Sequence, residues 1–581
     1  MFAGLCRLLV ALAMVGVSAA AVAQVIPPSE LPGRERERFT TYPTLPTDSI
    51  GRPTVGLPSA APPPGTSSVQ IIIRDVRISG VTVYRPDELA PLYAEFLGHK
   101  VSLAAVYEIA KRITDKYGAD GYVLSRALIL SQTIDPAGAV IQLRAVEGYV
   151  DRVEWPKDLV LKYRDLFSEY SAKIMAERPV NLYTIERYLL LAGDLPGLRL
   201  KNRLVPSKTH PGVAATLIVE ATEKPVDAMV RADNLGNTPR GPEQFLGTVS
   251  FKNPFHIHDA WTFTYAATYQ TKELQYVSGN YRQVLNSEGL SFYTFGAYGW
   301  GRPGVFELEA LNYRTKSLSF ETGLTQPFVR TRERNVTLTA LYFQSDDESE
   351  LLQTPASPLP TLDRLRGFRL RLEADWVDPF AGVNQFYGVF SQGIHGLGST
   401  NNDDIFASRY YGRVDFHKFE ATYARVQALG GGFSFFVAAL GQYAGTPLLY
   451  PEVCGYGGRV FGRAYDPSQL IGDHCAEVLG ELRFDVRPPS PIISQMQFYL
   501  YADQAWLRSI APFTGGVVPG TFVGPFGTVS TTTFTNVNAA SAGGGLRLGW
   551  LNAVSADLYA VKAIEGPRDD WRFRFIVTSR Y

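Results

Sequence analysis

The chain has 581 residues, and its 56 basic side chains balance 56 acidic ones. This length predicts two or more domains, and the balanced charge gives no basic excess of the kind that binds nucleic acid. After the N-terminal segment no stretch holds about 18 uninterrupted apolar residues, which argues against a protein that crosses a membrane with helices. The 53 Gly, 31 Tyr and 33 Phe instead favour many strands and tight turns, as in a β-barrel.

Residues 1–23 have the pattern of a secretory signal peptide. Arg7 precedes an apolar run over 8–17, and Ala21-Val22-Ala23 forms an Ala-x-Ala cleavage site. The apolar run is too short for a membrane anchor. We therefore expect a mature chain that begins near Gln24, lies outside the cytoplasm and has lost Cys6.

Segment 24–68 is rich in Pro, Ser and Thr, and such a composition predicts an extended linker. One island over 28–39 alternates in charge sign and favours a short polar helix. Because Pro32-Gly33 would interrupt a helix, we expect that helix to be confined to about 34–39.

Two consecutive segments, 69–148 and 149–224, repeat one pattern of strand, two helices and two strands, which indicates tandem α/β domains. In the first copy Ser102 is the expected cap of the second helix. The expected elements are strand 70–79, helices 86–96 and 103–117, and strands 126–134 and 139–147, followed by strand 150–155, helices 159–176 and 182–191, and strands 199–205 and 214–223.

A domain of this kind exposes a strand edge on which an extended peptide can add as a further strand. We expect 126–134 or a neighbouring edge to serve in this way. The alternative is that the two domains are only spacers.

From residue 225 onward, helical periodicity gives way to alternation. Over 368–376, Phe368, Leu370 and Leu372 point one way while charged residues such as Arg369 and Arg371 point the other. A soluble sandwich would not place charges on an inner face, whereas a water-filled barrel turns apolar residues to lipid and charges to its lumen. At about 22 residues per strand and connection, 225–581 accommodates roughly 16 membrane-spanning strands.

Several separated motifs resemble those of two-partner secretion outer-membrane transporters, the haemolysin secretion/activation family. Ala464 and Ala505 stand where the family usually has Gly, and Ser131 where it has Pro. The matching residues are Gly457, Gly458, Gly462, Arg463, Tyr465 and Asp466 in a long loop, Tyr501 and Asp503 on a later strand, Asp233, Asn234 and Gly236 on the first barrel strand, and Tyr122, Ser125, Arg126, Gln132, Glu147 and Gly148 in the first α/β domain.

This resemblance implies two small periplasmic α/β domains, of the type called POTRA, followed by a transmembrane antiparallel β-barrel of about 16 strands. The segments would be a signal peptide at 1–23, a plug helix and linker within 24–68, POTRA domains at 69–148 and 149–224, and a barrel at 225–581 with a folded loop at 446–474. The aromatic final strand, 571–581, is similar to the signal that directs such barrels to the barrel-assembly machinery.

The implied function is a pore in the Gram-negative outer membrane that exports one large secreted β-helical partner protein, received unfolded in the periplasm. Alternatives are an insertase of the same superfamily and a passive porin with accessory domains. We expect no enzyme, cofactor, metal or nucleic-acid partner: the seven His are scattered, and Gly543-Gly544-Gly545 lacks the Lys-Ser or Lys-Thr of a phosphate loop.

We predict that Arg463 reaches into the lumen and pairs with Asp503, because a guanidinium in a partly desolvated lumen needs a carboxylate on a nearby strand. We also predict a disulfide between Cys454 and Cys475. Loss of Cys6 leaves two thiols in an oxidising compartment, and they bracket the folded loop. The alternative is that both cysteines are small apolar residues that face lipid.

Overall fold

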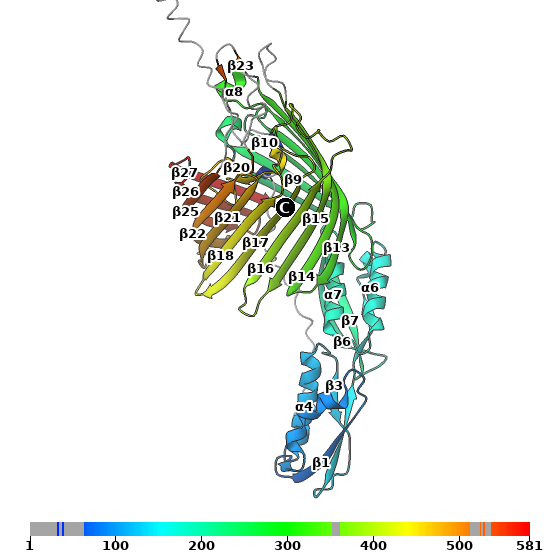
Figure 1. Cartoon of the computed structure of the whole chain (residues 1–581). Helices are drawn as coiled ribbons and strands as arrows, with labels where there is room; N and C mark the ends of the chain where they lie inside the picture. Colours follow the sequence, from blue (N-terminus) through cyan, green and yellow to red (C-terminus); the bar gives the residue numbers. More distant parts are fainter. Residues whose placement is uncertain are drawn as a thin grey trace, which may run out of the picture.

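The computed structural model describes residues 32–33, 38–39, 63–310, 312–350, 361–511, 523–524, 527–528 and 536–581. The predicted signal peptide and most of the predicted linker lie outside these residues. The described chain forms two α/β domains in succession and a closed barrel, and the domains extend from one end of the barrel with the first domain farther away (Figure 1). We call this end of the barrel the near end and the opposite one the far end.

The first domain is a four-stranded sheet of order β2-β1-β4-β3 with helix α4 packed against it. Its core joins Ile109 and Ile113 of the helix to Ile73 and Ile141 of the sheet. The elements are β1 (Gln70–Ser79), α3 (Pro86–Leu89), η2 (Ala90–Leu92), η3 (Ala94–Phe96), β2 (Lys100–Ser102), α4 (Ala104–Ala119), β3 (Arg126–Ile129) and β4 (Ala139–Val146).

Three expectations for this domain are wrong in detail. The first helix breaks into α3 and two 3₁₀ turns, because Pro91 has no N–H to donate within a helix. Ser102 caps no helix, since it pairs with Gln70 in the short strand β2, and Leu103 stands at the start of α4. Strand β3 ends at Ile129 instead of residue 134.

The second domain is a three-stranded sheet of order β5-β7-β6. The expected helix at 159–176 is divided into α5 and α6. Strand β6 pairs with β7 along its whole length and has no partner on its other side among the described strands. The elements are β5 (Tyr149–Glu154), α5 (Lys157–Val160), α6 (Arg164–Ala176), α7 (Leu182–Gly193), β6 (Leu198–Pro206) and β7 (Ala214–Glu223).

The barrel closes through sixteen antiparallel strands, which confirms the predicted fold class. On β15, Phe368 and Leu370 are 55% and 46% exposed on the outer wall, whereas the intervening Arg369 points inward to Glu321 and Glu452. The strands are β8 (Val226–Asp233), β9 (Gln244–Lys252), β10 (Asp259–Thr268), β11 (Gln275–Val284), β12 (Ser291–Gly301), β13 (Arg314–Arg330), β14 (Arg334–Glu350), β15 (Thr361–Val377), β16 (Val383–Gly393), β17 (His417–Gly430), β18 (Phe433–Ala444), β21 (His474–Asp485), β22 (Ile493–Arg508), β25 (Asn536–Trp550), β26 (Val554–Glu565) and β27 (Trp571–Arg580).

Charged contacts hold the second domain against the near end of the barrel. Asp194, just after α7, accepts two hydrogen bonds from the Arg330 guanidinium, from Nε and from Nη2, each at 2.7 Å. Glu288, in a barrel turn, accepts from Lys173 and Arg187 at 3.0 Å and from Tyr188 at 2.9 Å. Burial would raise the pKa of Glu288, but these donors outweigh it and lower that pKa.

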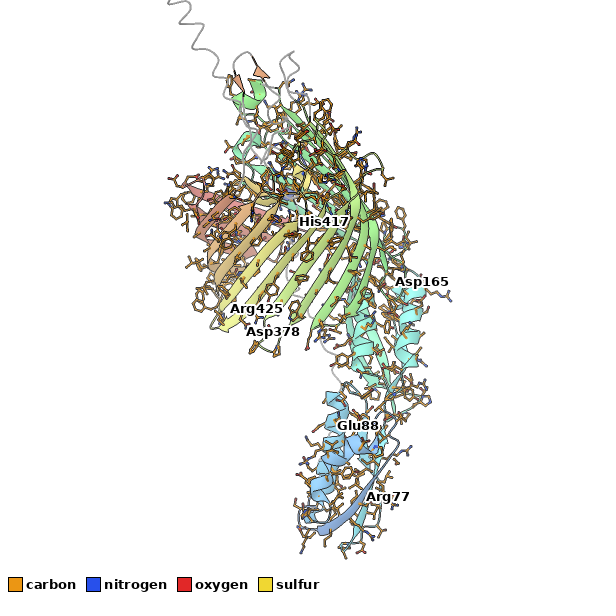
Figure 2. The ribbon with its side chains drawn as sticks, in the orientation of Figure 1. Arg77, Glu88, Asp165, Asp378, His417 and Arg425 are labelled. Atoms are coloured by element: carbon orange, nitrogen blue, oxygen red, sulfur yellow. A yellow bond between two sulfur atoms is a disulfide. The ribbon has the colours of Figure 1, made fainter. Side chains whose placement is uncertain are left out.

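Other charged residues mark the same end. Asp165 on α6 lies 3.3 Å from His258 in a near-end turn of the barrel. Figure 2 labels Asp165 on α6 beside the barrel, and it labels Asp378 and Arg425, which form an ion pair where strands β16 and β17 reach the near end.

Part of the predicted plug segment is described. Arg38 and Phe39 have helical backbone, and Phe39 is buried against Leu246, Leu274 and Tyr276 of the barrel wall. Tyr276 faces the lumen because its strand neighbour Val277 is exposed on the outer wall. Residues 34–37 lie outside the described residues.

The six motif residues of the first domain support its fold and its junction with the second domain. Glu147 accepts from the backbone N–H of Thr82 at 2.7 Å and from the Tyr117 hydroxyl at 2.8 Å. Burial opposes ionisation of Glu147, but these hydrogen bonds outweigh it and lower its pKa. Tyr122 packs edge-on against Tyr117.

The remaining motif residues make backbone contacts. Gln132 exchanges hydrogen bonds with the backbone of Gln142 and so extends the strand pairing beyond Ile129. Arg126 donates to the Gly212 carbonyl of the second domain at 3.0 Å. Gly148 donates from its N–H to the Ser125 hydroxyl at 3.1 Å.

Replacing Gly148 with alanine should loosen the junction of the two domains. A Cβ on Gly148 would lie 2.4 Å from the Leu124 carbonyl oxygen, a contact that only a backbone shift can relieve. We expect Gly148→Ala to increase limited proteolysis between the domains several-fold. Gly118→Ala is the matched control, since its Cβ would meet no atom within 4 Å. Equal cleavage of the two variants would contradict the steric role of Gly148.

Candidate functional site: the folded loop in the barrel lumen

The long loop between β18 and β21 folds back into the barrel. It contains the turn η5 (Tyr450–Glu452) and a small hairpin formed by β19 (Cys454–Tyr456) and β20 (Leu470–Gly472). The tip of this hairpin, 457–469, contacts lumen-facing side chains of β21, β22, β25 and β26. The apolar side chains of the tip and of the adjoining Tyr456 are buried, and they include Phe461, Ala464 and Tyr465. The tip therefore packs against the barrel wall as a small hydrophobic core.

Three glycines allow the tip to fold this tightly. Gly457 and Gly458 have φ of 121° and 118°, and Gly462 has φ of 67°, a region that disfavours any side chain. A Cβ on Gly457 would also lie 2.0 Å from the Asp466 carbonyl oxygen. Ala464 is not among the residues with positive φ, which explains why this position tolerates alanine.

Arg463 pairs with Glu481 of β21, so the prediction that it pairs with Asp503 is wrong. Glu481 is fully buried and also accepts from Arg483 at 2.7 Å and Arg547 at 3.1 Å. The Arg463 guanidinium carbon lies 4.4 Å from the centre of the Tyr501 ring. The Glu481 carboxylate thus binds three guanidinium groups, and the ring of Tyr501 covers the guanidinium of Arg463, which comes from the loop.

Asp503 does not pair with Arg463 because other donors already occupy its carboxylate. It accepts from the Tyr456 hydroxyl at 2.6 Å and from the Gly462 N–H at 2.7 Å, both on the loop. It also accepts hydrogen bonds from Ser541 of β25, from the backbone N–H at 3.0 Å and from the hydroxyl at 2.6 Å. Asp503 therefore fixes the backbone of the tip, while Glu481 fixes its arginine.

Sequence reasoning missed Glu481, although a usable signal was present. Strand 477–485 alternates, and this alternation turns Glu481 to the same lumen face as the neighbouring acidic residues Glu477 and Asp485. Glu481 pairs directly with Tyr501 in the register of β21 and β22, and Leu479 pairs with Asp503. The carboxylates of Glu481 and Asp503 are therefore diagonal neighbours on the lumen face. The prediction asked only for an acidic residue on a nearby lumen-facing strand, and both residues meet that requirement.

Asp466 and Tyr465 join the loop to the last strands. Asp466 accepts from Arg572 and, at 3.4 Å, from Arg568, and Arg574 lies 3.6 Å away. The Tyr465 hydroxyl donates to the Glu565 carbonyl at the end of β26. These contacts place the far side of the loop against the seam where the barrel closes.

The first-strand motif lies at the same seam. The strand ladder between β8 and β27 spans residues 229–233 and 576–580, and further backbone hydrogen bonds join Asn234 to Phe575 and Ala228 to Tyr581 at its two ends. Beyond it, the side chain of Asn234 donates to the Phe573 carbonyl and accepts from the Phe575 N–H, both at 2.9 Å. Asp233 is buried with Arg231 at 2.9 Å. Gly236 is confined by the Gly241 carbonyl oxygen, which a Cβ would approach to 2.3 Å.

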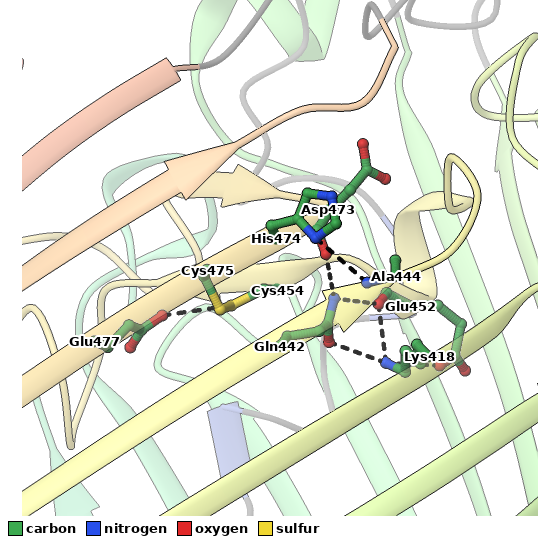
Figure 3. The surroundings of a disulfide bond; sticks show 9 residues. All are labelled: Lys418, Gln442, Ala444, Glu452, Cys454, Asp473, His474, Cys475 and Glu477. Atoms are coloured by element: carbon green, nitrogen blue, oxygen red, sulfur yellow. Dashed lines mark hydrogen bonds and ion pairs between the residues drawn. A yellow bond between two sulfur atoms is a disulfide. The ribbon is translucent and has the colours of Figure 1, made fainter.

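The base of the loop is cross-linked to the barrel. The structure contains the predicted disulfide, which joins Cys454 of β19 to Cys475 of β21 with a Cα–Cα distance of 6.2 Å (Figure 3). Beside it, Lys418 forms an ion pair with Glu452 at 2.8 Å, and Gln442 donates to the Asp473 carbonyl at 3.0 Å. Covalent and polar contacts thus hold both ends of the loop.

The only close group of metal-ligand residue types in the described part of the chain is Cys454, Cys475 and Glu477. Its two sulfur atoms are bonded to each other, so neither offers a thiolate to a metal ion.

These features define the class of protein: a closed sixteen-stranded β-barrel with an apolar outer wall, tandem α/β domains at one end and a folded loop anchored in its lumen. No helix of the described residues is long and apolar enough to cross a membrane. The model of the POTRA domain, ShlB-type, matches residues 71–148, and the model of the haemolysin secretion/activation protein ShlB/FhaC/HecB matches residues 214–524, more than half of the chain. The chain belongs to the ShlB/FhaC/HecB family.

The chain is similar to the outer membrane transporter CdiB of Dickeya dadantii, with 20% identity over 452 residues that cover 74% of this chain and 75% of that protein. The solved CdiB from Escherichia coli has a TM-score of 0.67 at 17% identity and covers 90% of this chain and 94% of that one. CdiB from Acinetobacter baumannii gives 0.58 at 14% identity, with 99% and 98% covered. At these identities the structures support the fold.

The family establishes the location and the transport function. The protein lies in the Gram-negative outer membrane with its POTRA domains in the periplasm, and it translocates a secreted partner protein by two-partner secretion. Members of the family are transporters and not enzymes. The near end of the barrel is therefore periplasmic and the far end extracellular.

The ion pair of Arg463 can be tested with a double-mutant cycle. We expect Arg463→Met and Glu481→Gln to show a coupling energy of about 1–3 kcal/mol, because each change removes the same buried contact. Arg463→Met combined with Asp503→Asn should show a smaller coupling energy, because Asp503 binds the backbone of the neighbouring Gly462 and not the guanidinium. Urea unfolding of the folded barrel in detergent measures both values.

Arg487→Met is the control for the loss of a cation, since Arg487 is exposed in a periplasmic turn. Stronger coupling of Arg463 to Asp503 than to Glu481 would restore the original pairing and contradict the one described above.

Proposed function

We propose that the protein captures one large β-helical partner unfolded in the periplasm, passes it through the barrel and releases it at the cell surface. The free energy would come from folding of the partner outside the cell, since no nucleotide is available in the periplasm. Support comes from the named relatives, which include the heme/hemopexin transporter protein HuxB of Haemophilus influenzae, 24% identical over 155 residues that cover 27% of each chain.

The observation that carries this proposal is the attachment of the second POTRA domain to the periplasmic mouth of the barrel. The bidentate pair of Asp194 with Arg330 and the contacts of Glu288 hold the domain at the pore opening. A peptide bound on this domain would already lie beside the channel. We assign the POTRA domains to 69–148 and 149–224 and the barrel to 225–581.

Strand β6 of the second domain is the docking edge that the contacts favour. In the first domain, the Thr114 hydroxyl of α4 accepts the Ala127 N–H of edge strand β3 at 3.0 Å, so part of that edge is already used. Strand β6 is longer, Leu198–Pro206, and has a strand partner on one side only among the described strands. A long unpaired edge can accept a peptide through backbone hydrogen bonds.

We further propose that the last strand directs assembly of the barrel. On β27, Trp571, Phe573 and Val577 are exposed on the outer wall at alternate positions. Such a strand could be recognised by the barrel-assembly machinery before insertion.

Deleting 69–223 tests the transport role of the POTRA domains. We expect the shortened barrel to insert and conduct ions, while the partner protein accumulates in the periplasm because nothing delivers it to the pore. Immunoblotting of culture medium and periplasm, with planar-bilayer conductance, measures both effects. Unchanged secretion by the shortened chain would favour a passive porin with accessory domains, and loss of other outer-membrane proteins would favour an insertase.

Strand addition to β6 predicts a periodic response to proline in the partner. Every second residue of an added strand donates its N–H to the docking edge, and proline removes that donor. A proline scan of a partner fragment should therefore weaken binding at alternate positions, with alanine at the same positions as the control. Equal binding by all the proline variants, measured by calorimetry, would rule out strand addition.

A further inference from the structure

A basic pocket of about 430 Å³ lies on the extracellular part of the barrel wall, between the loop after β10 and the loop after β12. Its lining includes Lys272, Arg302, Arg314 and Lys316, together with Trp300 and one carboxylate, Glu309. The pocket belongs neither to the lumen nor to the POTRA domains, and the transport function leaves it unexplained.

Strand register shows that this pocket faces outward. Gln275, Trp300 and Lys316 lie side by side on β11, β12 and β13. Two residues nearer the periplasm on the same strands, and therefore on the same face, are Val277, Tyr298 and Leu318. These three are 38%, 38% and 42% exposed on the outer wall, where the barrel meets lipid.

The pocket therefore lies at the level where apolar wall gives way to charge. Tyr298 and Trp300 stack with ring centres 5.3 Å apart, as expected for an aromatic girdle at a membrane interface. Lys316 and Arg314 follow Leu318 toward the far end. A row of cations directly above a girdle lies at the depth of the lipid headgroups.

The pocket has four cationic side chains, and three carboxylates form ion pairs with them. Lys272 lies 3.7 Å from Glu309 in the pocket wall, and Lys316 lies 2.9 Å from Glu350 and 3.9 Å from Glu348.

The two arginines, unlike the two lysines, remain available to bind an anion. Arg314 donates to the side-chain oxygen of Asn312 at 3.3 Å, and Arg302 is exposed. Neither arginine forms an ion pair within 4.0 Å among the described residues. Glu350 faces Arg314 across β13 and β14, but its carboxylate is bound by Lys316 at 2.9 Å. Both guanidinium groups can therefore donate to an anionic ligand without breaking an ion pair of their own.

We propose that this pocket binds a phosphorylated headgroup of the glycolipid in the outer leaflet, lipid A. Arg302 and Arg314 present planar forks that suit phosphate, and Lys272 adds a further positive charge. The aromatic pair below them contacts the apolar part of the lipid, while the pocket holds the sugar phosphate. A free phosphate ion would use the same cations but would not contact the girdle.

Native mass spectrometry of the full-length protein in detergent tests the proposal. The probes are bisphosphorylated lipid A, dephosphorylated lipid A and inorganic phosphate. We expect the double variant Arg302→Gln/Arg314→Gln to bind bisphosphorylated lipid A roughly 25-fold more weakly, about five-fold per removed charge. The matched control is Arg334→Gln/Arg487→Gln, two exposed arginines at the periplasmic end, which should change binding less than about two-fold.

Each probe separates one source of binding. Equal affinity for dephosphorylated lipid A would overturn the proposal, since only the apolar wall would be bound. Displacement of lipid A by inorganic phosphate at equal concentration would also overturn it, because the site would then be a simple anion site. If the arginine variant fails to fold, the variant Lys272→Gln/Lys316→Gln replaces it, and we expect the same loss of affinity for bisphosphorylated lipid A. Unchanged binding by that folded variant would overturn the proposed site.

Discussion

The buried carboxylate of Glu481 fixes the folded loop to the barrel, because three guanidinium groups converge on it from β21, β25 and the loop. An ion that is removed from water costs several kcal/mol unless opposite charges replace the lost hydration. Arg463 thus stabilises Glu481, and Glu481 keeps Arg483 and Arg547 from repelling each other across the lumen wall. Loop and wall therefore depend on the same charge.

A second anchor makes the position of the loop unique. Asp503 binds the Gly462 N–H and the Tyr456 hydroxyl, which fixes the backbone at the tip, whereas Glu481 fixes only the end of one long side chain. Glycine at position 462 is needed because the tip turns through positive φ as it approaches Asp503. The glycine-rich sequence of the loop and its acidic partners on the wall therefore form one constraint.

The sequence predicted the barrel, the tandem domains and the loop well, since alternation and glycine spacing are local signals. The partner of Arg463 was not predictable in the same way. Both Glu481 and Asp503 face the lumen, and the choice depends on backbone donors such as Gly462 N–H that a sequence does not reveal. Ser102 was misplaced for a similar reason: its pairing with Gln70 is a contact between distant residues, which overrides its local preference for a helix cap.

The loop also contributes to closure of the barrel itself. The strand ladder between β8 and β27 covers only five residue pairs, and beyond Asp233 the Asn234 side chain reinforces one further backbone hydrogen bond, from the Asn234 N–H to the Phe575 carbonyl. Arg572 and Arg574 lie on that same stretch of β27, and Asp466 of the loop neutralises them. Withdrawal of the loop from the lumen would remove the Asp466 carboxylate from both arginines, leaving Arg572 with Asp570 and Arg574 with the Asn234 carbonyl beside the least extensively paired seam of the wall. Asp466 thus links the position of the loop to the charge balance beside the seam between the first and last strands.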